Sequence, residues 1–344
     1  MKFLNDDLKD FSPYSSPLIK DGIILNANES CFMPPKKVLE EIKKSILNID
    51  YNRYPDMDER LLNQAIAAHY GVEEENVTCG VGSDELLDTT FRAALGPNDL
   101  VLGFMPSFSM YKVFAKLSHA KFINVEPNDN MLFDVDKMID KIKTYQPKIA
   151  IVCSPNNPTG QYFSKDDVRK VIEANPNVLI ILDLAYIDFA KEDYTKIALE
   201  YDNVIAFKTF SKALALPSIR VGYAISKKDN IDMINSIKAP YSINSISQII
   251  ATIAINNFDL YKEQIELIKQ QREFLYKELI RFGFNAYRSE ANFIYVLMDD
   301  VYNDELLKNK IYIRKFQSGI YRITVGTEEE NKKLLEVLKC VQVK

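Results

Sequence analysis

The chain has 344 residues, of which 47% are hydrophobic and 26% are charged, and its formal net charge is −5. This balance excludes a disordered chain, and the length predicts a large domain with a smaller second one. An acidic chain without a basic run is a poor partner for nucleic acid or an anionic membrane, and no apolar run is long enough to span a bilayer. The N-terminal stretch is acidic and lacks the apolar segment of a signal peptide, so we expect a cytoplasmic protein.

Cysteine and histidine usage narrows the possible chemistry. The four cysteines are widely separated and form no CxxC pair, which predicts free thiols in a reducing compartment. The two histidines, His69 and His119, do not have the spacing of metal ligands. We therefore expect no metal site, and the composition argues against a zinc hydrolase and against a Ser-His-Asp mechanism.

Short apolar runs alternate with helical patterns through the first two thirds of the chain. Most runs are continuous β-branched or aliphatic stretches, which predicts strands of a parallel sheet with both faces buried. These runs are residues 77–81, 99–104, 121–125, 148–153, 178–183, 204–209 and 221–225. Residues 84–95 and 164–175 have helical patterns, and the alternation predicts an α/β domain over residues 31–245 with a mostly parallel seven-stranded sheet.

The pattern changes after residue 245. Residues 246–282 are predicted to form one long amphipathic helix, and a final helix is predicted over residues 328–341. Between them lie three strand-like segments, at 292–298, 310–316 and 320–326. We expect a smaller α+β domain made of residues 246–344 together with the N-terminal residues 1–30.

Polar and aromatic side chains follow the predicted strands at the points where these strands end. In an open parallel sheet, ligands bind beyond the carboxyl ends of the strands, so these side chains are expected to meet at one edge. They are Ser83, Asp84 and Glu85 at the start of a helix, Phe108, Asn157 in SPNNPTG, Asp183 with Tyr186, and Ser211 with Lys212. Each also has an ordinary structural explanation, such as a helix cap, a turn or a charged end to a strand.

A single ligand accounts for all of these side chains together. An aromatic cation with a phosphate tail needs a helix N-terminus and hydroxyls for its phosphate, and Arg220 is available for bidentate pairing. Such a ligand also needs a carboxylate at its ring nitrogen, a flat side chain on its ring face and a lysine to form an imine. Pyridoxal 5′-phosphate has these requirements. A dinucleotide is disfavoured, because no GxGxxG motif follows any strand.

Seven motifs then occur in a fixed order along the chain: LNANES, NRYPD, GSDELLD, SPNNPTG, LDLAYIDF, TFSK followed by an arginine and GY, and YRITVGTEEEN. With these motifs the chain resembles the fold-type I aminotransferases, and more narrowly the histidinol-phosphate aminotransferase family. The matches extend from about residue 11 to residue 331, nearly the whole chain. The resemblance implies a pyridoxal 5′-phosphate-dependent aminotransferase with a large α/β domain and a smaller C-terminal domain.

By this resemblance Lys212 is the lysine that binds the cofactor covalently. Asp183 faces the pyridine nitrogen, and Tyr186 and Asn157 hydrogen-bond the phenolic oxygen. The apolar run 213–217 is expected to keep water away from Lys212. Exclusion of water lowers the pKa of the amine and prepares it to act as a general base and then as a general acid.

The resemblance also implies a phosphate site and a dimer. Phe108 occupies the place of the aromatic side chain that stacks on the cofactor ring. The phosphate is expected to contact the first turn at Ser83, Asp84 and Glu85, together with Thr209, Ser211 and Arg220. Tyr54, in NRYPD, corresponds to a tyrosine that reaches the phosphate of the neighbouring subunit's cofactor. This correspondence implies a homodimer with shared active sites.

Three further residues resemble substrate-binding positions of the family. Arg322 matches the arginine that binds the substrate α-carboxylate, and Arg314 resembles a position that helps to hold a substrate phosphate. Tyr14 resembles a tyrosine at the substrate entrance. Together they suit glutamate or 2-oxoglutarate as one partner and a small phosphorylated amine or ketone, such as histidinol phosphate, as the other.

The chain departs from the family pattern at Leu184, where the family usually has glutamate, and within residues 13–17 and 214–218. These departures leave the phosphorylated partner open. One alternative is another phospho-ketone, such as dihydroxyacetone phosphate with serinol phosphate as its amine. Another is an amino-acid phosphate decarboxylase on the same fold. A non-catalytic sensor that binds the cofactor is disfavoured, because the acidic chain offers no fused DNA-binding region.

Overall fold

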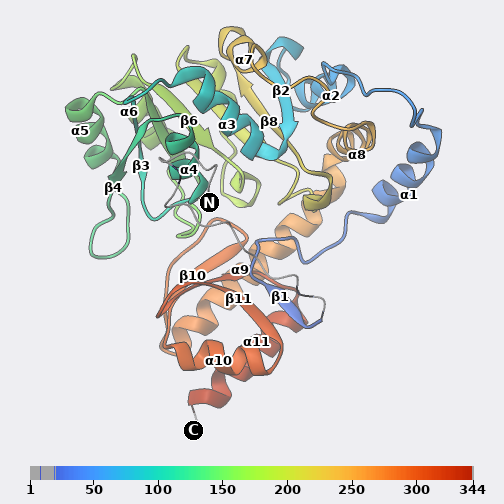
Figure 1. The fold of residues 1–344 in the computed structure, drawn as a ribbon. Coiled ribbons are helices and arrows are strands. Elements are labelled where there is room, and N and C mark those ends of the chain that lie inside the picture. Colours follow the sequence, from blue (N-terminus) through green and yellow to red (C-terminus); the bar gives the residue numbers. More distant parts are fainter. Residues whose placement is uncertain (1–7, 9–18, 20, 343–344) are drawn as a thin grey trace.

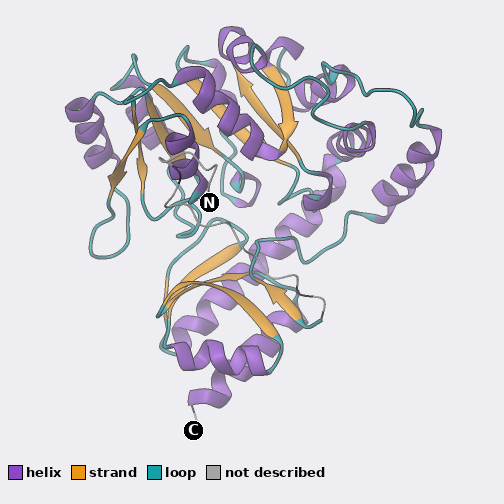
Figure 2. Ribbon diagram, in the orientation of Figure 1, coloured by secondary structure: helices purple, strands orange, loops and turns teal. Residues whose placement is uncertain are grey.

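The computed structural model describes residues 8, 19 and 21–342. Figure 1 shows a larger body with a seven-stranded sheet and a smaller body with a five-stranded sheet. Helix α9 (Lys262–Arg281) runs from the larger body into the smaller one, and Figure 2 shows helices around both sheets. In this part of the chain, no helix is long and apolar enough to cross a membrane. The cytoplasmic location stays a prediction.

The larger sheet has the strand order β2-β8-β7-β6-β5-β3-β4. Its neighbouring strands are parallel except for β8, which is antiparallel to both β7 and β2. The strands are β2 (Val77–Val81), β3 (Leu100–Phe104), β4 (Lys121–Val125), β5 (Ile149–Cys153), β6 (Leu179–Asp183), β7 (Val204–Thr209) and β8 (Val221–Ser226). The predicted mostly parallel, seven-stranded sheet of an α/β fold is therefore confirmed.

Both faces of this sheet are buried, which explains why its strands are continuous apolar runs. In β6, Ile181 belongs to a hydrophobic core that also contains residues of α3, α4 and α7, whereas Ile180 and Leu182 belong to a second core with residues of α5 and α6. These helices are α3 (Gly82–Ala94), α4 (Met110–Leu117), α5 (Val135–Tyr145), α6 (Lys165–Glu173) and α7 (Lys228–Asn235). Around β2 and β8 lie α1 (Lys36–Ser45), α2 (Arg60–Tyr70) and α8 (Ser245–Asn256).

The smaller sheet has the order β1-β11-β12-β10-β9. Its elements are β1 (Ile23–Leu25), β9 (Asn285–Ala286), β10 (Phe293–Leu297), β11 (Ile311–Gln317) and β12 (Ile320–Thr324), with α9, α10 (Asp300–Lys308) and α11 (Glu328–Gln342) packed on them. Strand β1 pairs in parallel with β11, so an N-terminal strand completes a sheet made otherwise of C-terminal residues. The domain boundaries near residues 30 and 245 stay a prediction.

The single helix predicted over residues 246–282 is wrong. Helix α8 ends at Asn256, a 3-10 turn follows, and α9 begins at Lys262. The side chain of Asn257 donates to the carbonyl of Ile253 at 2.9 Å. Asparagine competes with helical backbone hydrogen bonds in this way, and it therefore favours a helix end. The break lets the chain leave the larger body and enter the smaller one.

A buried ion cluster fixes the strand that leads to Lys212. Lys208 on β7 is 1% exposed, and its Nζ lies 2.7 Å from Asp188 Oδ1 and 2.8 Å from Asp193 Oδ2. Burial by itself lowers the pKa of Lys208, but the charges of Asp188 and Asp193 outweigh it and raise this pKa well above its usual range. Because both aspartates follow β6, the cluster ties the segment that carries Tyr186 to β7.

Replacing Lys208 with methionine removes the cation and keeps most of the apolar stem. The two carboxylates then lose their counter-ion, so the free energy of unfolding at neutral pH is expected to fall by about 3 kcal/mol, measured by urea denaturation. Lys227→Met is the matched control, because Lys227 pairs with Asp202 at the surface and should contribute less than about 1 kcal/mol. Equal effects of the two substitutions would contradict this expectation.

Candidate active site

A cavity of about 850 Å³ lies where the carboxyl ends of the larger sheet's parallel strands meet the smaller sheet. The predicted site residues that line it are Ser83, Asp84, Phe108, Asn157, Asp183, Tyr186, Thr209, Ser211, Lys212, Arg220, Arg314 and Arg322. The order of the strands therefore gathers side chains from loops that are far apart in the sequence, as the rule for open parallel sheets predicts.

Other residues singled out in the sequence lie elsewhere. The carboxylate of Glu85 accepts from the backbone amide of Val81 at 2.5 Å, so its side chain caps the helix start. Tyr54 is 81% exposed and does not line the cavity of its own chain. Leu184 is fully buried in the core beneath α5 and α6, so this departure from the family pattern adds apolar packing behind the cavity. Tyr14 lies outside the described residues.

Lys212 lies in a short loop after β7. The loop closes on itself, because the amide of Leu216 donates to the carbonyl of Phe210 at 3.1 Å. The Nζ of Lys212 donates to the carbonyl of Ala27 at 3.0 Å. Burial, together with the positive charge of Arg322, lowers the pKa of Lys212 to about 8. This shift raises the fraction of uncharged amine at neutral pH by about two orders of magnitude over an ordinary lysine, which makes the amine a better nucleophile and base.

Asp183, at the end of β6, is a buried carboxylate held by two donors. It is 5% exposed; its Oδ2 accepts from the hydroxyl of Tyr111 at 2.5 Å, and its Oδ1 accepts from the amide of Ala185 at 3.1 Å. Burial raises the pKa of Asp183, while the two hydrogen bonds oppose that rise. The carboxylate therefore has a fixed orientation at the floor of the cavity.

Tyr186 is linked to the smaller sheet through Asn28. The side-chain nitrogen of Asn28 donates to the hydroxyl of Tyr186 at 2.9 Å. The amide of Asn28 donates to Thr324 Oγ1 at 3.0 Å, and its carbonyl accepts from Asn292 Nδ2 at 3.1 Å. Asn28 is 1% exposed and has a φ of 55°, a backbone conformation that asparagine adopts more readily than most residues. One buried residue therefore fixes the tyrosine against both β12 and the start of β10.

Asn28 is the last of three consecutive residues that contact groups in the cavity. The carbonyl of Asn26 accepts from Arg322 Nη2 at 3.0 Å, and the carbonyl of Ala27 accepts from Lys212. LNANES carries part of the family resemblance, but no residue in it had a predicted role. These contacts join residues 158, 185 and 296 positions apart, so only the folded chain shows them.

The N-terminus of α3 forms the part of the cavity that suits a phosphate. The N-cap residue of α3 is Val81, which has no polar side chain to hydrogen-bond the amides of the first turn. Arg220 lies beside it, with Nη1 3.5 Å from Ser211 Oγ and Nη2 3.6 Å from Asp84 Oδ2. A Cβ on Gly222 would lie 2.2 Å from the amide nitrogen of Ser83, so glycine is needed for this close approach of helix and strand. Backbone donors at a helix start, with a guanidinium and a hydroxyl alongside, form an anion site.

Two arginines occupy the wall contributed by the smaller sheet. Arg314 on β11 and Arg322 on β12 are directly opposed cross-strand partners. Arg322 is 7% exposed, donates to Asn157 Oδ1, and has its guanidinium 5.3 Å from the ring centroid of Phe293. The guanidinium of Arg314 lies 5.9 Å from the ring centroid of Phe316. Guanidinium groups held in this way are suited to bidentate pairing with carboxylate or phosphate.

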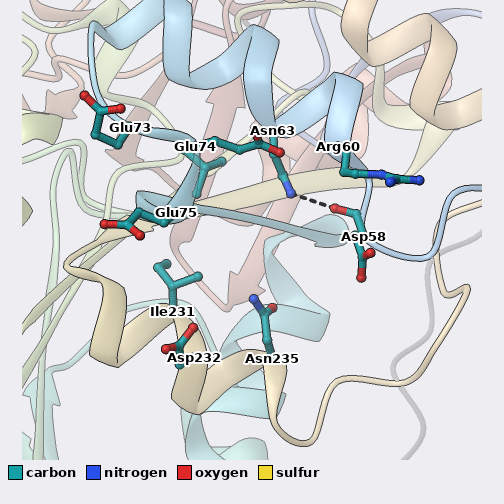
Figure 3. A pocket seen from close by; sticks show the side chains of 10 residues that line it. Asp58, Arg60, Asn63, Glu73, Glu74, Glu75, Ile231, Asp232 and Asn235 are labelled. Atoms are coloured by element: carbon teal, nitrogen blue, oxygen red, sulfur yellow. Dashed lines mark hydrogen bonds between the residues drawn. The ribbon is translucent and has the colours of Figure 1, made fainter.

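A second cavity, of about 680 Å³, lies away from these groups (Figure 3). It is lined by Asp58, Arg60, Asn63, Glu73, Glu74, Glu75, Val77, Ile231, Asp232 and Asn235. The side chain of Asn63 donates to the carbonyl of Asp58 at 2.9 Å. This lining contains neither a lysine nor an aromatic ring, so the second cavity does not match the cofactor.

The first cavity contains the groups that pyridoxal 5′-phosphate requires. A helix N-terminus with Arg220 suits the phosphate, and the buried carboxylate of Asp183 suits a protonated ring nitrogen. The amine of Lys212 has the lowered pKa that covalent attachment needs. The donor set therefore fits this cofactor.

Comparison with known proteins also indicates an aminotransferase. Residues 20–338 match the model of the family "aminotransferase class I and II". A histidinol-phosphate aminotransferase from Clostridium novyi (strain NT) is 34% identical, covering 98% of this chain and 95% of that protein. A histidinol-phosphate aminotransferase from Thermoanaerobacter pseudethanolicus is 35% identical, covering 98% of this chain and 97% of that protein. The crystal structure of the Sinorhizobium meliloti histidinol-phosphate aminotransferase in complex with pyridoxal-5′-phosphate has a TM-score of 0.89 at 23% identity, covering 99% of both chains.

Fold and cavity together define a pyridoxal phosphate-dependent enzyme of fold type I. The chain belongs to the class I and II aminotransferase family, and it is similar to histidinol-phosphate aminotransferases over nearly its whole length. The predicted family, fold type and cofactor are confirmed. The roles of individual side chains stay predictions, which are developed below as proposals.

The lowered pKa of Lys212 predicts a distinctive titration in the cofactor-free protein. The amine should be protonated below about pH 8 and uncharged above it. Trace acetylation across a pH series, quantified by mass spectrometry on the peptide that contains Lys212, should therefore have its midpoint near pH 8. Arg322→Gln should raise the midpoint, because a nearby positive charge is lost. In the urea-unfolded chain the midpoint should approach 10.5, and equal midpoints in folded and unfolded protein would refute the expectation.

Proposed function

We propose that this enzyme transfers an amino group between glutamate or 2-oxoglutarate and a small phosphorylated amine or ketone similar to histidinol phosphate. The observation that carries the proposal is the pair of arginines, Arg314 and Arg322, on the wall of the cavity that contains Lys212. The names of the full-length relatives from C. novyi and T. pseudethanolicus support the choice of phosphorylated partner.

The two arginines favour anionic substrates. Opposed residues on neighbouring strands have their Cβ atoms about 5 Å apart, and like charges at that separation destabilise each other. Glutamate brings two carboxylates and the phosphorylated partner, which binds in turn, brings a phosphate, so either substrate would reduce this repulsion. We assign the α-carboxylate of glutamate to Arg322, which also contacts Asn157, and the phosphate of the other substrate to Arg314, which lies on the adjacent strand.

The cavity residues would hold the cofactor as follows. Lys212 would bind its aldehyde carbon, Asp183 its protonated ring nitrogen, and Tyr186 with Asn157 its phenolic oxygen, while Phe108 would stack on the ring. The phosphate would contact the first turn of α3 at Ser83, Asp84 and Glu85, together with Thr209, Ser211 and Arg220. When bound, pyridoxal phosphate supplies an electron sink that stabilises negative charge at the substrate's α carbon.

Lys212 would also move the proton that defines transamination. Its uncharged amine would accept the proton from the substrate's α carbon and, as an ammonium group, would hold that proton for its return. The lowered pKa supports this role, because a base needs an appreciable uncharged fraction near neutral pH. The ring centroid of Tyr186 lies 5.8 Å from the Nζ, so the amine lies beside the tyrosine assigned to the phenolic oxygen.

We also propose that the enzyme is a homodimer in which Tyr54 reaches the partner's active site. Tyr54 is 81% exposed and stacks on Tyr241, with ring centroids 4.7 Å apart. Leu47 and Tyr51, which are 81% and 66% exposed, lie in the segment between α1 and α2, and Leu61, which is 73% exposed, lies in the first turn of α2. Large apolar side chains exposed this close together are typical of a surface that another protein covers. Figure 1 shows α1 standing apart at the edge of the larger body.

The substrate proposal is tested with purified enzyme and three candidate reactions. Glutamate should be converted to 2-oxoglutarate in the presence of imidazole acetol phosphate. Arg314→Gln should raise the KM of the phosphorylated partner by roughly 10- to 100-fold, since a hydrogen bond to a charged group contributes about 1.5–3 kcal/mol. The half-reaction with glutamate should change far less in this variant.

Two outcomes would redirect the proposal. Preference for dihydroxyacetone phosphate over imidazole acetol phosphate would assign the other phospho-ketone. Release of carbon dioxide from a phosphorylated amino acid, with no reaction of glutamate, would favour a decarboxylase. One of the similar structures is an L-threonine-O-3-phosphate decarboxylase from Porphyromonas gingivalis, with a TM-score of 0.82 at 17% identity, so the fold itself admits that chemistry.

The dimer proposal predicts complementation between two inactive or impaired variants. Tyr54→Ala and Lys212→Ala should each lose activity, for different reasons. When the two proteins are unfolded together and refolded as a mixture, mixed dimers regain one site with both residues intact. Activity should then exceed that of either variant refolded alone. A monomer by sedimentation, or a mixture no more active than its parts, would count against shared active sites.

A further inference from the structure

Tyr111 lies directly behind the proposed cofactor site, although no sequence motif assigned it a role. It is the second residue of α4, is 1% exposed, and directs its hydroxyl to Asp183 Oδ2 at 2.5 Å. Its ring meets the ring of Phe108 edge to face, with centroids 5.5 Å apart and an interplanar angle of 85°. One side chain therefore contacts both residues that would hold the cofactor ring, at its nitrogen and at its face.

The hydroxyl of Tyr111 is the side-chain donor that stabilises the Asp183 carboxylate. Asp183 forms no salt bridge within residues 21–342, and its second oxygen receives the amide of Ala185. A buried carboxylate without a cation depends on hydrogen bonds to remain ionised. The phenol satisfies this need without adding positive charge, so the carboxylate keeps its attraction for a protonated ring nitrogen.

We propose that Tyr111 is a positioning residue that orients the Asp183 carboxylate, keeps it ionised for the cofactor's ring nitrogen, and supports Phe108 against the ring. The proposal rests on the cofactor-binding role of Asp183 given above. Tyr111 acts through these two neighbours and contacts no reacting atom. Its contacts come from α4, whereas Asp183 lies at the end of β6, so the two residues meet only because β3 and β5 bring that helix over the strand end.

The charges around Tyr111 and Asp183 keep the Tyr111 hydroxyl a hydrogen-bond donor to Asp183 over a broad pH range. Burial, together with the charge of Asp183, raises the pKa of Tyr111 well above its usual range, so the phenol stays a donor. Burial also raises the pKa of the Cys153 thiol on β5, the strand next to β6. The charge of Asp84 on α3 adds to the rise in the pKa of Asp183. Tyr186 faces the same carboxylate, and burial raises its pKa to about 12.

Tyr111→Phe is the direct test, because it removes the hydroxyl and keeps the ring against Phe108. Equilibrium dialysis of the purified protein with pyridoxal phosphate should show a dissociation constant at least about tenfold higher than that of the wild type. Loss of the donor also raises the pKa of Asp183. The ionised form is then lost at higher pH, so the acid limb of cofactor binding should move upward by roughly one pH unit.

Tyr261→Phe is the matched control. Tyr261 is also fully buried, and within the described chain its hydroxyl has no hydrogen-bond partner. This variant should bind pyridoxal phosphate as the wild type does. If both variants weakened binding equally, or if Tyr111→Phe left both the dissociation constant and the acid limb unchanged, the proposal would be overturned.

Asp183→Asn separates failure of this inference from failure of the proposed function. If Asp183→Asn impairs binding and Tyr111→Phe does not, only the role of Tyr111 is wrong. If Asp183→Asn has no effect, the cofactor-binding role of Asp183 is wrong, and the role of Tyr111 falls with it. If both impair binding, adding Tyr111→Phe to Asp183→Asn should produce little further loss, because the tyrosine acts through the carboxylate. If the two substitutions weakened cofactor binding independently, so that their fold-changes in dissociation constant multiplied, the proposal would be contradicted.

Discussion

The burial of both faces of the larger sheet is the constraint on which the rest of the structure depends. Alternate residues of a strand such as β6 enter two separate cores, so neither face can accept a polar side chain without a partner. A polar side chain within a strand therefore needs partners, as Lys208 has in Asp188 and Asp193, and the polar groups that line the cavity lie at or beyond the strand ends. Because six of the strands share one direction and only β8 opposes them, most of these ends lie at one edge. The cavity is a consequence of that packing, and its chemistry follows from which residues end each strand.

The anion-binding groups of this edge are placed at two points of one cavity. Lys212, Arg220, Arg314 and Arg322 line it together with four carboxylates, those of Glu29, Asp84, Glu126 and Asp183. The positive charge of Arg322 and burial both disfavour a protonated lysine, which is why the pKa of Lys212 falls to about 8. Anions that pair with the arginines would relieve the repulsion. The lysine is thus kept reactive by the same charges that would bind the phosphate and carboxylate groups of cofactor and substrate.

The N-terminal segment joins the two halves of this site. Strand β1 belongs to the smaller sheet, and the residues that follow it contact Arg322, Lys212 and Tyr186 in turn. The arginine wall is therefore connected to the lysine loop by hydrogen bonds to the carbonyls of two consecutive residues, Asn26 and Ala27. Side chains supported in this way keep a defined separation, which the orientation of a substrate against a reactive group requires.

The sequence by itself determined the strands, the polar residues near the end of each strand, and most of the cavity residues. Apolar runs, turn residues and strand ends are local signals, so they can be recognised without the fold. Asp183, Asn157 and Lys212 could be located because Asp183 ends a strand and the other two lie within four residues of a strand end. Only the tertiary structure decided the break after α8 and the contacts of Tyr111 and Asn28. Their partners lie 72 and 158 residues away, and which side chains meet at such separations depends on strand order and helix placement. Periodicity within a segment contains no information about those distances, so the groups that support the site became visible only in the folded chain.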